Sequence, residues 1–182
     1  MKKVKNIKIL GRVALEKLLP EESKKHVVIY YTNSEYPEYP FVKNHAINSL
    51  HMPIEDIDHY EFKYVRPIVA EDVQRFLDFS DGYNELVVAC QAGVSRSSAT
   101  AYLIGAKKWG PIAALELLQP AYHYPNRLIV YIGSKLLGNN DIWQKYIDWM
   151  KNWCGLDPSQ SHGWPKIEMV EKMGFDKVPK KE

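Results

Sequence analysis

Cys90 and Arg96 are separated by five uncharged residues in this chain, and Ser97 follows the arginine directly. A thiolate is a strong nucleophile, and the planar guanidinium of an arginine can hold two oxygens of a phosphate group at once. Gly93, in the middle of the intervening residues, allows a left-handed backbone or a close approach to a ligand. This spacing of thiol, glycine and guanidinium therefore indicates chemistry on a phosphate ester.

The segments on either side of these residues are expected to position them. An apolar run at residues 86–89 predicts a buried strand, and a helical pattern begins at about Ser95. A loop between a strand end and a helix start directs several backbone N–H groups to one point, which also faces the positive end of the helix dipole. The loop residues expected to bind phosphate are Gln91, Ala92, Gly93, Val94, Ser95 and Arg96.

Three side chains have expected roles in the reaction. Cys90 is the expected nucleophile, because a helix N-terminus and a nearby arginine favour the thiolate form of a cysteine. Arg96 is expected to hold two phosphate oxygens while charge spreads over them in the transition state. Ser97 is expected to donate a hydrogen bond to the sulfur and to help it leave when the covalent intermediate is hydrolysed.

The sequence around this loop resembles the cysteine-dependent protein tyrosine phosphatase superfamily, in its compact dual-specificity type. The resemblance rests on A-G-V-S-R-S-S-A-T-A-Y, on A-L-E-L-L further on, on P-I-E-D at 53–56 and on P-N at 125–126, and it covers roughly residues 26–150. It extends to a group of predicted bacterial and phage tyrosine phosphatases. The resemblance implies that Asp56 is the general acid. Asn126 is expected either to brace the signature loop or to be a turn residue.

The sequence leaves two features of the site open, namely the general acid and the residue before the nucleophile. Asp58 lies two residues after Asp56 on the same expected loop and is the alternative general acid. The superfamily usually has a histidine directly before the nucleophile, where this chain has Ala89. That replacement is consistent with a slower enzyme, and it is the only feature that supports a phosphopeptide-binding pseudophosphatase.

The order of the expected elements indicates an α/β fold. Strands at about 26–31, 46–52 and 86–89 alternate with helices, which is typical of a mainly parallel central sheet with helices on both faces, as in dual-specificity phosphatases. Because loops that follow parallel strands meet at one edge of the sheet, Asp56 and Cys90 are expected to lie near each other. A further short strand is expected at 5–10, a loop at 33–40, and helices at 12–19, 71–79, 95–109, 112–118, 128–137 and from Asp141 to about 153.

Length and composition predict one globular domain. The chain has 182 residues, of which 46% are hydrophobic, and a formal net charge of +2. We expect a single phosphatase domain at 1–153 and a partly ordered C-terminal tail at 154–182, with a short helix near 167–172. The small net charge predicts no nucleic-acid partner. The chain has only two cysteines, which is typical of a cytoplasmic protein, and it has no long apolar run, so we expect no membrane contact.

These features predict a metal-independent phosphatase, without a cofactor, that hydrolyses phosphotyrosine monoesters through a cysteinyl-phosphate intermediate. Phosphoserine and phosphothreonine are further candidate groups. The expected partner is a phosphorylated protein or peptide, with phosphate or another oxyanion in the loop. The alternatives are a phosphatase of RNA 5′-phosphates, phosphoinositides or other small phosphate esters, and a pseudophosphatase. The uncharged side chains of Gln91, Ala92 and Val94 weigh against a polyanionic substrate.

Overall fold

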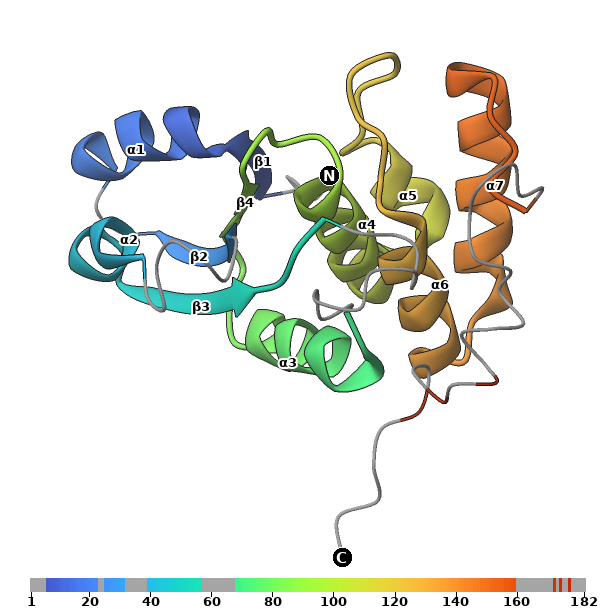
Figure 1. Cartoon of the computed structure of the whole chain (residues 1–182), viewed down its shortest axis with the longest axis horizontal. Helices are drawn as coiled ribbons and strands as arrows, with labels where there is room; N and C mark the ends of the chain where they lie inside the picture. Colours follow the sequence, from blue (N-terminus) through green and yellow to red (C-terminus); the bar gives the residue numbers. More distant parts are fainter. Residues whose placement is uncertain are drawn as a thin grey trace, which may run out of the picture.

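The structure is a computed structural model, which describes residues 6–22, 25–31, 39–56 and 68–159 together with 172, 174 and 177 (Figure 1). Within these residues four strands and seven helices follow one another. They are β1 (Ile7–Gly11), α1 (Arg12–Glu21), β2 (His26–Tyr31), α2 (Pro40–His45), β3 (Asn48–Pro53), α3 (Ala70–Asp81), β4 (Leu86–Cys90), α4 (Arg96–Trp109), α5 (Pro111–Leu115), α6 (Arg127–Leu136) and α7 (Asn140–Cys154).

The four strands form one parallel sheet in the order β1-β4-β2-β3. Strand β4 pairs with β1 on one side and with β2 on the other, and all five of its residues are buried. A strand that is covered on both faces needs apolar side chains on both, which explains the continuous apolar run at 86–89. Because all strands run the same way, their carboxyl ends share one edge of the sheet, where Cys90 pairs with Gly11.

Helices cover both faces of this sheet, as the sequence predicted (Figure 1). Helices α1 and α2 enclose a small apolar cluster with strands β2 and β4, which includes Leu15, Leu19 and Val27. The larger core lies on the other face, where α3 and α4 pack on the sheet. Helices α5 and α6 pack against α4, and α7 packs outside α5 and α6. Helix α4 is buried along most of its length, as is β4. The loop between them is therefore anchored at both ends by buried elements.

The predicted strands and the main helices are confirmed, with shifts of a few residues at their ends. Residues 33–38 of the expected loop lie outside the described residues, and its last residue, Pro40, begins α2. Proline suits a first helical turn, where its missing N–H has no partner to lose. Helix α5 ends at Leu115 rather than at 118. The last helix is capped by Asn139, whose side-chain oxygen accepts the N–H of Asp141 at 3.0 Å. The short helix expected near 167–172 lies almost entirely outside the described residues.

Candidate active site

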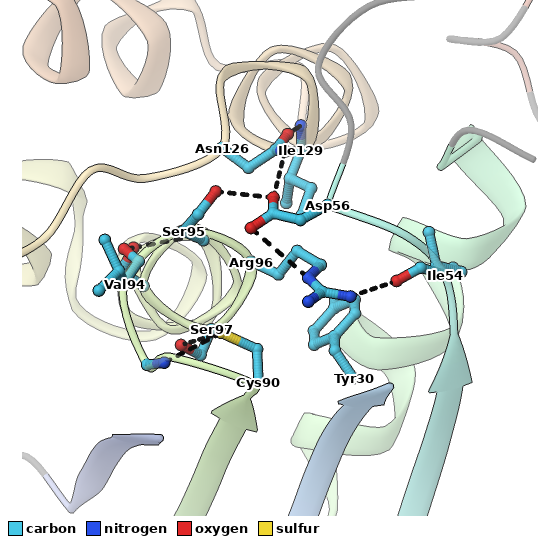
Figure 2. Close-up of polar contacts among 12 residues, drawn as sticks. Tyr30, Ile54, Asp56, Cys90, Val94, Ser95, Arg96, Ser97, Asn126 and Ile129 are labelled. Carbon is cyan, nitrogen blue, oxygen red and sulfur yellow. Dashed lines mark hydrogen bonds and ion pairs between the residues drawn. The ribbon is translucent and has the colours of Figure 1, made fainter. Parts of the chain in front are cut away.

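The thiol of Cys90 lies at the end of β4, enclosed by the loop that follows it (Figure 2). Its Sγ accepts a hydrogen bond from the backbone N–H of Gly93 at 3.3 Å and lies 3.1 Å from the Oγ of Ser97. Only 1% of Cys90 is exposed. The loop thus curls around the sulfur and presents both a backbone and a hydroxyl donor to it.

The loop can curl in this way because Gly93 has a left-handed backbone with φ of 77°. A Cβ at this position would lie 2.5 Å from the backbone nitrogen of Gly11, at the end of β1. The N–H of Arg12, the next residue, donates to the carbonyl of Gln91 at 3.2 Å. The end of β1 therefore supports the outer side of the loop, a contact for which the sequence carries no local signal.

The guanidinium of Arg96 is buried at the start of α4. Its Nη1 donates to the carbonyl of Ile54 at 2.5 Å, and its Cζ lies 5.8 Å from the centre of the Tyr30 ring. The Nε atom is 3.7 Å from the Oδ2 of Asp56. The Tyr30 ring and the Ile54 carbonyl therefore fix the position of this guanidinium.

Tyr30 is a part of the site that sequence reasoning missed. It is 2% exposed, and its hydroxyl forms a 2.7 Å hydrogen bond with the Oγ1 of Thr100 in α4. Burial raises the pKa of Tyr30 far above its ordinary value, so the ring stays neutral under Arg96. Its position in the aromatic strand His26–Tyr31 indicates only a core residue, and nothing in the spacing links it to Arg96.

The carboxylate of Asp56 lies beside the loop, three residues after β3 ends. Its Oδ1 accepts hydrogen bonds from the Oγ of Ser95 at 2.8 Å and from the Nδ2 of Asn126 at 3.0 Å (Figure 2). Its side chain is 36% exposed, so it reaches both the loop and solvent. Asp58, the alternative general acid, lies outside the described residues.

The segment at 119–126 runs along the loop and binds its carbonyl groups. The N–H of Tyr124 donates to the carbonyl of Val94 at 3.1 Å, and the N–H of Asn126 donates to that of Ser95 at 3.2 Å. The hydroxyl of Tyr122 donates to the carbonyl of Ala92 at 3.3 Å. Of these residues, sequence reasoning included only Asn126; the two tyrosines were not recognised as neighbours of the loop.

Ala89, the residue in the place of the usual histidine, is fully buried. Its side chain belongs to the apolar cluster under α1 and α2, together with Leu15, Val27 and Val87. This small side chain fits a part of the core that is made of aliphatic residues. The site therefore contains no imidazole directly before its thiol.

Within the ranges given above, no group of three or more His, Cys, Asp or Glu side chains is arranged to hold a metal ion. Among the same residues, no helix combines the length and the apolar character needed to cross a membrane.

The parallel four-stranded sheet with helices on both faces defines an α/β fold that is also found in solved structures. The crystal structure of DUSP15 is similar, with a TM-score of 0.52, 15% identity, and coverage of 83% of this chain and 94% of that chain. This similarity confirms the predicted fold. No protein-family model and no curated protein sequence matches the chain.

Two further solved structures have lower TM-scores against this chain. Tk-PTP in its active form has a TM-score of 0.49 at 13% identity, over 76% of this chain and 90% of that one. The Yvh1 phosphatase domain from Chaetomium thermophilum has a TM-score of 0.47 at 14% identity, over 96% of this chain and 95% of that one.

Proposed function

We propose that this chain is a metal-independent phosphatase that hydrolyses phosphotyrosine monoesters through a cysteinyl-phosphate intermediate. The observation that carries the proposal is the loop at 90–96. At one end of it the thiol of Cys90 accepts the Gly93 N–H at 3.3 Å, and at the other end the buried Arg96 is the first residue of α4. Amide donors, a helix N-terminus and a buried cation together favour a bound dianion. The fold shared with DUSP15 agrees with this chemistry.

In the first step, the thiolate of Cys90 attacks phosphorus in line with the leaving oxygen. The S–P bond forms as the P–O bond breaks, while Arg96 and the loop amides stabilise the equatorial oxygens. Asp56 gives its proton to the leaving oxygen, so that a neutral phenol departs.

In the second step, the carboxylate of Asp56 takes a proton from a water molecule that attacks the thiophosphate. The S–P bond breaks, inorganic phosphate leaves, and the thiolate of Cys90 returns. Ser97, whose Oγ lies 3.1 Å from the sulfur, stabilises the charge that develops on it. The rate is therefore expected to fall both when Cys90 is protonated and when Asp56 has lost its proton.

Exposed aromatic residues beside the loop support an aryl phosphate as substrate. Tyr122 and Tyr124 are 50% and 41% exposed, and both bind carbonyl groups of the loop. Aromatic side chains at this rim can pack against the ring of a phosphotyrosine. The loop itself offers no second cation for a polyanion, since its residues between Cys90 and Arg96 are uncharged.

The test is phosphate release from para-nitrophenyl phosphate and from a phosphotyrosine peptide, each with and without a metal chelator. The chain is expected to turn over both, and the chelator should have no effect. Cys90→Ser should abolish turnover while phosphate still binds, whereas Cys154→Ser, at the other and only partly buried cysteine, should keep it. Substantial turnover by Cys90→Ser would contradict the proposal, and so would a wild-type chain that binds phosphopeptide without releasing phosphate.

The substrate class is tested by trapping on the Cys90→Ser or Asp56→Ala variant. The panel contains phosphotyrosine, phosphoserine and phosphothreonine peptides, 5′-phosphorylated nucleotides and inositol lipids. Retention of phosphotyrosine peptides above the others supports the proposal. Preferential retention of a nucleotide or a lipid would contradict phosphotyrosine as the substrate but would leave the proposed reaction mechanism unchanged.

A further inference from the structure

We propose that Ser95 and Asn126 are positioning residues that clamp the general acid by one oxygen, Oδ1, so that the proton for the leaving group is delivered from the other, Oδ2. This inference rests on the proposed function, because it specifies how Asp56 acts in the first step. It assigns a role to the hydroxyl of Ser95, whose backbone N–H alone was expected to contribute.

The clamp consists of two donors on the same atom. The Oγ of Ser95 lies 2.8 Å from Oδ1 of Asp56, and the Nδ2 of Asn126 lies 3.0 Å from it (Figure 2). Asp56 is not held by the sheet, because β3 ends at Pro53. These two contacts, together with the Arg96 guanidinium 3.7 Å from Oδ2, direct its side chain toward the loop.

The orientation of the Asn126 amide follows from its other partner. The backbone N–H of Ile129, in the first turn of α6, donates to the Oδ1 of Asn126 at 3.2 Å. A backbone N–H can only donate, so the oxygen of the amide must face Ile129 and the NH₂ group must face Asp56. Asn126 thus caps α6 with one end of its side chain and holds the acid with the other.

The second oxygen of Asp56 faces the phosphate site. Its Oδ2 lies 3.7 Å from the Nε of Arg96, the group that is expected to hold the phosphate oxygens. With Oδ1 occupied by two donors, the proton of the neutral acid belongs on Oδ2. It passes from there to the leaving oxygen as the P–O bond breaks and the S–P bond forms. The resulting carboxylate keeps both hydrogen bonds on Oδ1.

Two single variants test the clamp. Ser95→Ala removes one donor. Asn126→Ser removes the other and keeps an uncharged oxygen that can cap α6. General acid catalysis matters most when the leaving group is poor, so each variant is assayed with phenyl phosphate and with para-nitrophenyl phosphate. We expect kcat to fall about tenfold more with phenyl phosphate than with para-nitrophenyl phosphate, as for the loss of one hydrogen bond to a charged group.

The controls separate positioning from damage to the loop. Ser95→Thr keeps the hydroxyl and should restore the wild-type ratio of the two rates. Inhibition by inorganic phosphate should be unchanged in Asn126→Ser, because no charge is added and the backbone N–H of residue 126 still donates to the carbonyl of Ser95. In an Asp56→Asn background the additional effect of either variant on the ratio should disappear, since residues that act through one group are not additive.

The outcomes distinguish the clamp from the proposed function. If Asp56→Asn changes the leaving-group ratio but Ser95→Ala and Asn126→Ser do not, the clamp is wrong and the proposed acid stands. If both clamp variants lower the two rates equally and weaken phosphate inhibition, they act on the loop and the inference is also wrong. If the wild-type chain releases no phosphate from either ester, the proposed function itself fails.

Discussion

The Sγ of Cys90 and the Oγ of Ser97 lie 3.1 Å apart, although seven positions separate the two residues in the chain. The sulfur ends a strand and the hydroxyl sits in the first turn of α4, so the loop between them must close into a ring. Both residues are at most 1% exposed. A hydrogen bond in such surroundings is stronger than one in water.

Replacing Ser97 by alanine should slow the second step more than the first. Without the hydroxyl, the sulfur leaves the thiophosphate less readily, and the loss of one hydrogen bond to a charged group corresponds to about a tenfold lower kcat. Rapid-quench measurements should show a burst of phenol release followed by slow phosphate release. Ser134→Ala is the control. It removes another buried hydroxyl, which donates to the carbonyl of Tyr131 within α6, and this variant should show no burst. Equal slowing of both steps would contradict the assignment.

Gly93→Ala should remove phosphate binding. The new Cβ would need a left-handed backbone and would lie 2.5 Å from the nitrogen of Gly11, so the loop must open. Gly110 is the matched control, because it has φ of 87° but no atom within 4 Å of an added Cβ. Gly110→Ala should therefore lower the free energy of unfolding by about 1 kcal/mol and keep activity. Calorimetric titration with phosphate measures the difference, and retained phosphate affinity in Gly93→Ala would refute it.

Arg96→Lys should lose most activity even though the charge is kept. A lysine cannot hold two phosphate oxygens through a planar fork, and it cannot contact Ile54 and the Tyr30 ring in the same way. We expect kcat/KM to fall about 10²- to 10³-fold, as for the removal of a donor that stabilises the transition state. Arg12→Lys, at a half-buried arginine beside the same loop, should change it little. A similar loss of activity in both variants would contradict a specific requirement for the planar guanidinium of Arg96.

Acid should destabilise the segment that carries Asn126. Burial lowers the pKa of His123 below its ordinary value of 6.5, and its Nδ1 accepts the N–H of Gln119 at 2.9 Å. The unfolded chain therefore takes up a proton near pH 6.5 that the folded chain does not, so stability falls as the pH drops through this value. Urea unfolding midpoints should decrease more between about pH 7.5 and 5.5 in the wild type than in His123→Asn. An equal decrease in the two proteins would contradict this role of His123.

The strand, loop and helix around Cys90 could be predicted because their signals are local. An apolar run, a central glycine and the Gly-Pro stop at 110–111 each act through their nearest neighbours in the chain. The nearness of Asp56 to the loop also followed, since loops after parallel strands share one edge. By contrast, α2 was missed because Pro40, which suits a loop, also suits a helix start.

The contacts that complete the site could not be read from spacing. Asn126 and Asp56 are 70 positions apart, and so are Tyr30 and Thr100. Each pair depends on how helices pack on the sheet, which no local pattern encodes. The same holds for Gly11, whose backbone meets Gly93 only because β1 lies next to β4.

The strand order has a consequence for how the chain assembles. Strand β4 is the last of the four strands to be synthesised, yet it lies between β1 and β2. A growing chain on the ribosome therefore exposes unpaired edges of both strands until residues 86–90 enter the gap, and such edges favour aggregation. The strand that brings the thiol is also the one that closes the sheet. Phosphate captured by its loop would thus act as a folding ligand, which binds only the completed sheet and shifts the equilibrium toward it.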